Sequence, residues 1–261
     1  MKIGICAKIT PDTDTRIKVQ GDGIDPTGVK WVVSPYDLFG VEEAIRTKEA
    51  LSDSVEEVIG YSVGPSSILT QLRQSCLALG ADRAVIVSGE SAESTDSLGV
   101  AKCLAKAIAR DDVSLVFCGK VALDDDNTQV PAMIAALLDW ELLSRVSAFE
   151  TDGSSFTATR NLDGGVEEVV TGNLPVVVTA DRGLNTPRYA KLPAIMKAKR
   201  KPVDQLSPGD LGLSDEDLAA QVRATAWSLP EERPSGRILE GDLSTQVKEL
   251  VRLLREEAKV I

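Results

Sequence analysis

The chain has 261 residues, of which 43% are hydrophobic and 26% charged, so it is long enough for one large α/β domain with appendages. Its 29 basic and 40 acidic residues give a formal net charge of −11, which argues against binding to nucleic acid or to a membrane surface. Histidine is absent, which excludes a Ser-His-Asp triad and zinc sites with a histidine ligand.

Strands and helices alternate in the first half of the chain. Apolar runs predict strands at residues 2–8, 55–63, 83–87 and 113–118, and helical patterns lie between and after them. Residues 13–33 are polar and Gly-rich, which predicts a hairpin excursion before the helix that Ser34 and Pro35 begin. This alternation indicates an α/β fold with a doubly wound, mostly parallel sheet and helices on both of its faces.

The second half of the chain begins with a β-hairpin region and becomes irregular. Short strands are predicted at residues 147–151, 155–160, 166–171 and 175–180. Residues 202–228 resemble an extended arm, with short helices possible only at 210–213 and 217–222. We therefore expect an α/β nucleotide-binding domain at residues 1–206 and a C-terminal arm at residues 207–261.

A terminal helix is predicted within this arm. Ser244 can cap it, and its apolar stripe consists of Val247, Leu250, Val251, Leu254 and Ala258. Such a stripe must be buried, either in the helix's own domain or in a partner.

The four cysteines are Cys6, Cys76, Cys103 and Cys118, and no two of them have metal-ligand spacing. Their apolar surroundings predict buried free thiols. No apolar run approaches the length of a membrane span and no secretory signal is visible, so we expect a cytoplasmic protein with no membrane partner.

Residues 113–140 contain the most informative strand-to-helix connection. The strand breaks at Gly119, an acidic loop follows at Asp124–Asn127, and a helix is expected to open at Thr128 with Pro131 in its first turn. The N–H groups at a helix N-terminus favour an anion such as phosphate. Three consecutive aspartates repel phosphate unless they turn away, so spacing alone favours the simpler interpretation of a helix cap.

Residues 184–201 carry six basic residues and no acidic residue. Such a run is usually a solvated face. Here it is interleaved with Tyr189, Leu192, Ile195 and Met196, which is unlike a charged tail.

Several motifs in order along the chain resemble the β subunit of electron-transfer flavoproteins. They are Ser34-Pro35-Tyr36 with Val41-Glu42-Glu43-Ala44, Gly80-Ala81-Asp82-Arg83-Ala84, Asp163-Gly164-Gly165 with Arg160 and Glu167, and Leu184–Ala190 with Leu192-Pro193 and Ile195–Lys199. The last group follows the family almost residue for residue. Ser34 replaces the usual asparagine, and Pro131 stands where the family commonly has glycine and cannot donate an N–H to phosphate.

The resemblance implies an adenine-nucleotide α-hydrolase-like fold and an electron carrier, not an enzyme with its own substrate. In the family the β subunit forms an obligate heterodimer with an α subunit and shares one FAD, which the α subunit mainly holds. The β subunit also buries AMP. Electrons come from flavin dehydrogenases and pass to a quinone oxidoreductase or another acceptor, and the flavin performs the chemistry. The arm would pack on the α subunit.

The resemblance also assigns site residues. The expected cofactor-binding residues are Cys6, Ser34, Pro35, Tyr36, Asp37, Val63, Ala122, Leu123, Asp124, Asp125, Asp126, Asn127, Thr128, Gln129, Val130, Pro131, Ala132 and Met133, of which Tyr36 would approach the flavin. The expected partner-binding residues are Pro187, Arg188, Tyr189, Leu192, Pro193, Ile195, Met196, Lys197, Lys199, Arg200 and Lys201, with Leu192 as the anchor. No catalytic residue and no metal ligand is expected.

Two alternatives remain open. In bifurcating relatives a second FAD replaces AMP, and these tend to carry Gly-Asp-Thr where this chain has Asp125-Asp126-Asn127, so we expect AMP. A stand-alone nucleotide-binding regulatory protein without flavin would have a similar sheet. It would have no use for residues 184–201 or for the arm.

Overall fold

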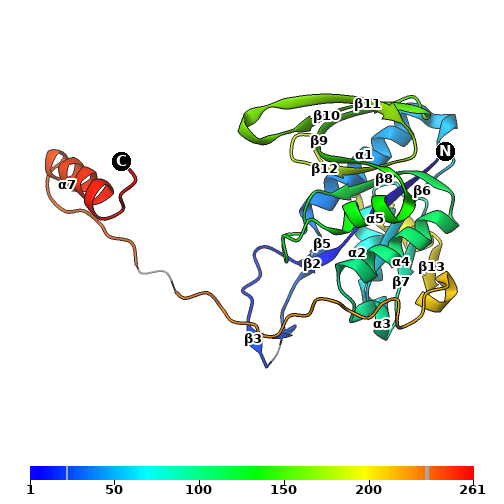
Figure 1. Cartoon of the computed structure of the whole chain (residues 1–261), viewed down its shortest axis with the longest axis horizontal. Helices are drawn as coiled ribbons and strands as arrows, with labels where there is room; N and C mark the ends of the chain where they lie inside the picture. Colours follow the sequence, from blue (N-terminus) through cyan, green and yellow to red (C-terminus); the bar gives the residue numbers. More distant parts are fainter. Residues whose placement is uncertain (22, 233–234) are drawn as a thin grey trace. The chain divides into compact units, whose positions relative to one another are not determined.

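The computed structural model of the chain describes residues 1–21, 23–232 and 235–261 (Figure 1). Contacts divide the chain into two compact units, Met1–Thr225 and Ala226–Ile261. The first unit contains all the strands, and the second contains one helix, α7, within the part of the chain that the structure describes. No helix among the described residues combines the length and the apolar character needed to cross a bilayer.

A nine-stranded sheet with the order β11-β10-β9-β12-β8-β1-β6-β7-β13 forms the centre of the first unit (Figure 1). All neighbouring strands from β9 to β13 in this order pair in parallel. Their bounds are β1 (Lys2–Cys6), β6 (Glu57–Val63), β7 (Arg83–Val87), β8 (Val113–Gly119), β9 (Glu141–Thr151), β12 (Val176–Ala180) and β13 (Val203–Leu206). The prediction of a mostly parallel sheet is confirmed.

Alternate residues of the central strands enter two different hydrophobic clusters. Ile3 and Ile5 of β1 pack in one cluster, and Cys6 packs in the other. The first cluster lies against α1 (Pro35–Leu51), α2 (Leu69–Leu72) with its flanking turns η2 (Ser66–Ile68) and η3 (Arg73–Leu77), and α6 (Leu192–Ala198). The second lies against α4 (Ser97–Arg110) and α5 (Val130–Leu138), with α3 (Glu90–Glu93) before α4. Because side chains alternate across a strand, this pattern places helices on both faces of the sheet.

The hairpin excursion predicted at residues 13–33 begins earlier, at Ile9, and its described residues form two short antiparallel pairs. Strand β2 (Ile9–Pro11) pairs antiparallel with β5 (Trp31–Val33), and β3 (Val19–Gln20) pairs antiparallel with β4 (Gly23–Ile24). The excursion ends at Val33, directly before the start of α1.

One edge of the sheet is antiparallel, as the hairpin prediction requires. Strand β10 (Ser155–Asn161) pairs with β9 and with β11 (Glu167–Asn173), and the turn η4 (Asp163–Gly165) precedes β11. Strand β9 is longer than the predicted 147–151, because its first half pairs in parallel with β12. Arg145 has a positive φ of 59° at the register shift. This irregularity interrupts the alternation of side chains between the two faces of the strand, so the sequence pattern does not reveal the first half of β9.

The opposite edge contains a strand that the sequence pattern did not predict. Strand β13 pairs in parallel with β7, and the turn η5 (Pro208–Leu211) follows it. The compact unit continues to Thr225, and Leu218 is only 2% exposed within it. Thr95 donates a 2.7 Å hydrogen bond to the Leu218 carbonyl. The short helix expected at 217–222 is wrong, since these residues form turns and irregular backbone.

The second unit contains α7 (Leu243–Glu256). Its cap is Asp242, which accepts a 2.8 Å hydrogen bond from the Thr245 N–H, so the prediction of a Ser244 cap is wrong by two positions. No residue of α7 is buried, and its apolar stripe includes the exposed side chains of Val247, Leu250 and Val251.

Candidate functional site

The expected nucleotide-binding residues meet at the carboxyl edge of the parallel sheet. Strands β8, β1 and β6 are neighbours, and they end at Gly119, Cys6 and Val63. The chain moves from β1 through β6 to β7 on one side and returns to β8 on the other side. The strand order therefore reverses between β1 and β8, which is where open α/β sheets bind ligands.

Asp37, in the first turn of α1, joins the two strands at this reversal. Its Oδ2 accepts a 2.7 Å hydrogen bond from the Lys8 N–H, and its Oδ1 accepts a 2.9 Å bond from the Gly119 N–H. Burial raises the pKa of Asp37 to about 7, although both N–H bonds act in the opposite direction.

Gly119 allows this close approach. A Cβ atom at residue 119 would lie 2.4 Å from Asp37 Oδ1 and 2.7 Å from the Asp37 backbone nitrogen. Only glycine leaves room for α1 to begin here.

Ser34 occupies the N-cap position of α1, but its side chain makes no cap hydrogen bond. The residue is 0% exposed, and its hydroxyl has no hydrogen-bond partner among the described residues. A buried hydroxyl is normally paired, so this one fits a site that receives a polar ligand group. In the first turn of α1, Pro35 has no N–H, and the N–H groups of Asp37 and Leu38 donate to the Ser34 carbonyl at 2.9 Å and 3.3 Å, which leaves the Tyr36 N–H for a ligand.

The acidic loop is held by residues that are distant in sequence. Lys8 Nζ lies 2.9 Å from Asp124 Oδ1 and 2.8 Å from Asp125 Oδ2. Asn127 Nδ2 donates a 2.8 Å bond to Ser97 Oγ. These contacts turn two of the three aspartates toward a cation, which reduces their repulsion of an anionic ligand.

Helix α5 begins at Val130, so the expected start at Thr128 is wrong. Thr128 has a φ of 56°, and Asp126 has a φ of 49°, so the backbone before the helix is left-handed at both residues. Pro131 lies in the first turn of α5, as predicted.

Tyr36 lies beside a charged pair that sequence reasoning missed. Lys120 Nζ is 5.0 Å from the centroid of the Tyr36 ring and 2.6 Å from Asp181 Oδ1. Asp181 is 4% exposed, and burial raises its pKa, but the bonds from Lys120 and the Arg182 N–H bring the pKa below its usual range. The sequence signal that could have identified Lys120 is its position directly after Gly119, the last residue of β8.

All four cysteines are buried free thiols, as predicted. Cys6 and Cys118 lie at the ends of the neighbouring strands β1 and β8. A hydrogen bond with Cys6, together with burial, raises the pKa of Cys118 well above its usual range.

The basic segment, residues 184–201, presents three apolar side chains to solvent. Tyr189 is 95% exposed, Leu192 is 73% exposed and Met196 is 55% exposed. We call these three residues the docking patch. Ile195 instead packs partly buried against the core, and Lys197, Lys199 and Arg200 of the same segment are exposed.

Two of the basic residues expected to meet a partner contact the chain itself. The Arg188 guanidinium binds Glu42 and Glu49 of α1. Lys201 Nζ donates to the carbonyls of Leu77 and Ala81, and burial lowers its pKa.

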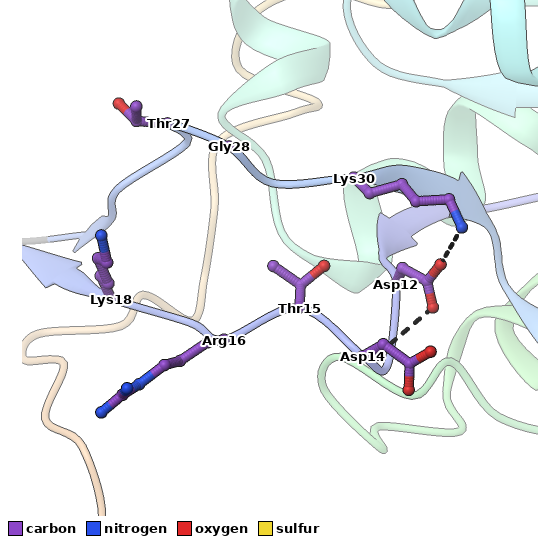
Figure 2. A pocket seen from close by; sticks show the side chains of 8 residues that line it. All are labelled: Asp12, Asp14, Thr15, Arg16, Lys18, Thr27, Gly28 and Lys30. Atoms are coloured by element: carbon purple, nitrogen blue, oxygen red, sulfur yellow. Dashed lines mark hydrogen bonds and ion pairs between the residues drawn. The ribbon is translucent and has the colours of Figure 1, made fainter.

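A pocket of about 490 Å³ lies away from this edge, in the hairpin excursion (Figure 2). It is lined by Asp12, Asp14, Thr15, Arg16, Lys18, Thr27, Gly28 and Lys30. Lys30 Nζ is 2.6 Å from Asp12 Oδ2, so one of its cations is already paired. None of the residues expected to bind a cofactor lines it.

Comparison with known proteins gives one consistent family. Residues 23–211 match the family described as Electron transfer flavoprotein domain. The chain is 36% identical to Electron transfer flavoprotein subunit beta of Bacillus subtilis (strain 168) over 262 residues, covering 100% of both chains. It is 41% identical to the Mus musculus subunit beta over 91% of this chain and 92% of that relative. It is 38% identical to the Homo sapiens subunit beta over 97% and 99%.

Proposed function

The chain belongs to the electron transfer flavoprotein β-subunit family, and we propose that it carries electrons as one half of a heterodimer with an α subunit. Flavin dehydrogenases donate the electrons, and a quinone oxidoreductase or another acceptor receives them. The docking patch carries this proposal, because an exposed apolar patch ringed by lysine and arginine suits a brief encounter with an acidic partner.

FAD, when bound between the two subunits, supplies the electron storage. In this chain Tyr36 lies at the expected flavin side of the carboxyl edge, with the Lys120 ammonium beside its ring. Lys120 places a positive charge there, and Asp181 fixes its orientation. No side chain of this chain needs to form or break a covalent bond.

AMP, in this proposal, binds at the same carboxyl edge. The buried Ser34 hydroxyl, the Tyr36 N–H and the N–H groups of α5 that Pro131 leaves at its N-terminus can bind the polar groups of AMP. Lys8 Nζ lies 2.8 Å from Asp125 Oδ2, and Asp125 stands where bifurcating relatives tend to carry glycine. These features support AMP over a second flavin.

The proposal includes a cytoplasmic location and packing of the second unit on the α subunit. The exposed apolar stripe of α7 supports the latter.

Cofactor content tests the proposed function. The chain, purified together with its α subunit and then denatured, should release one FAD and one AMP per heterodimer, which chromatography can measure. Two FAD would identify the bifurcating type of flavoprotein. A complex that contains no flavin would support the stand-alone regulatory protein instead.

A further inference from the structure

Arg188 uses its N–H donors in hydrogen bonds to carboxylates of α1. Its Nε lies 2.9 Å from Glu42 Oε2, its Nη2 lies 2.9 Å from Glu42 Oε1, and its backbone N–H also donates to Glu42. Nη1 and Nη2 reach the two oxygens of Glu49 at 2.6 Å and 2.9 Å. A guanidinium has five N–H donors, so this double engagement leaves little for an outside carboxylate.

A second attachment joins Asn185 of the basic segment to the same helix. Asn185 Nδ2 donates to the Phe39 carbonyl at 2.9 Å and to Glu43 Oε2 at 2.8 Å. Both Glu42 and Glu43 are almost fully buried, at 4% and 6% exposure. The entrance to the basic segment is therefore fixed along one face of α1, directly before the docking patch begins at Tyr189.

We propose that Arg188 is a positioning residue, which binds Glu42 and Glu49 so that Tyr189, Leu192 and Met196 already face outward before a partner arrives. This inference rests on the proposed docking function. A segment fixed in its bound conformation loses less conformational entropy on association, so docking is stronger without any added contact. Arg188 thus acts by fixing the backbone directly before the patch, with its donors already engaged by Glu42 and Glu49.

The variant Glu49→Gln distinguishes a pure charge effect from the positioning of Arg188, because the two explanations predict opposite changes in docking affinity. Its side chain is 57% exposed and lies beside a basic segment. If charge alone governs docking, Glu49→Gln makes the surface more positive and strengthens binding to an acidic partner. If Glu49 holds Arg188 in place, the same variant loosens the segment and weakens docking.

The experiment uses the FAD-loaded heterodimer and a reduced flavin dehydrogenase from the same organism. For Glu49→Gln we expect the KM for the dehydrogenase to rise about tenfold, which corresponds to about 1.4 kcal/mol. The limiting rate, flavin content and thermal midpoint should stay unchanged. Arg188→Lys should raise the KM to a similar extent, because lysine keeps the charge but cannot bind two carboxylates in the forked geometry, and it should also lower the thermal midpoint because Glu42 is buried.

Asp53→Asn is the matched control. Asp53 is an exposed acid just after α1 and forms no ion pair within the described part of the chain. It should leave the KM unchanged or lower it slightly. An unchanged or lowered KM in Glu49→Gln would overturn the positioning role.

Trypsin gives a readout that needs no redox partner. Lys191, Lys197 and Lys199 are cleavage sites in or beside the patch, and a loosened segment should be cut about tenfold faster in both Glu49→Gln and Arg188→Lys. Equal cleavage rates in variants and wild type would contradict the inference. A heterodimer that binds no FAD would instead contradict the proposed function, and the cleavage rates would still report on Arg188.

Discussion

The Asp37 carboxylate accepts a 2.9 Å hydrogen bond from the backbone N–H of Gly119, which fixes the first turn of α1 to the end of β8. The same carboxylate binds the N–H of Lys8 at the end of β1. One side chain thus sets the spacing of the crevice in which the proposed nucleotide lies.

Gly119→Ala should separate α1 from β8. The added methyl group would lie 2.8 Å or less from Asp37 and from the Tyr36 backbone. Because two of these three close atoms belong to the backbone, the clash can be relieved only by moving α1. We expect a loss of about 3 kcal/mol in the free energy of unfolding, together with reduced AMP content. Gly60→Ala is the control, because its methyl group would meet Cys76 at an ordinary 3.4 Å. Equal behaviour of the two variants in urea would contradict the prediction.

Asp37 should make stability depend on pH. Its pKa is about 7 in the folded chain against 3.8 for the free group, so the folded state binds the proton more tightly. The free energy of unfolding should therefore fall as pH rises from about 4 to about 7, and change little above that. Asp37→Asn should remove this slope. An infrared carboxylic-acid band that titrates near pH 7, and that Asp37→Asn abolishes, would identify the group directly.

Leu192→Ala should impair docking without affecting folding. Leu192 is 73% exposed, so its truncation leaves no cavity in the core. Loss of an anchor of this kind costs on the order of 2 kcal/mol, or roughly thirtyfold in the docking equilibrium. Ile195→Ala is the control, because Ile195 packs against the core and its truncation should lower the thermal midpoint. A lowered midpoint with normal reduction kinetics in Leu192→Ala would make it a packing residue.

The exposed cations should govern the rate of encounter. Replacing Lys197, Lys199 and Arg200 with glutamine should slow association with the dehydrogenase about tenfold at low salt and flatten its salt dependence. Lys201→Gln should instead lower stability, because Lys201 Nζ donates to the carbonyls of Leu77 and Ala81. Stopped-flow reduction at several ionic strengths distinguishes these effects. An unchanged salt dependence in the triple variant would remove these residues from the encounter.

Truncation after Thr225 should weaken association with the α subunit. The remaining residues form one compact unit, so the sheet should fold normally. The removed helix has an apolar stripe with no buried residue, which a partner can cover. Size-exclusion chromatography over a dilution series would measure the effect. Unchanged assembly and FAD retention would place the helix outside the α-subunit interface.

Local sequence patterns predicted the core of this fold well. Strand β7 occupies the predicted residues 83–87, and α1 begins at Pro35, because an apolar run and a proline are signals within one short segment. Strand β13 was missed because it has only four residues, three half-buried and one exposed, which carry little pattern. The partners of Lys8 were also missed, since Asp124 lies 116 residues away and no local pattern specifies a contact at that distance.

The partner of a basic residue is equally hidden in the sequence. Arg188 and Lys197 are alike in the sequence, as cations in one basic segment. Arg188 has two carboxylates on α1, 139 and 146 residues away, whereas Lys197 is exposed. Only the packing of the segment on α1 separates a structural cation from one that faces solvent.

The strand order constrains the length of the basic segment. The chain leaves the sheet at β12, passes through the basic segment and returns at β13, and β8, β1, β6 and β7 lie between these two strands. The segment is therefore a strap of matched length that crosses α1 and is fastened at both ends. A deletion within it must strain the sheet itself, whereas a substitution on its outer surface disturbs nothing beneath. If the segment docks redox partners as proposed, substitutions at Tyr189, Leu192 and Met196 should alter docking while the length of the strap stays constant.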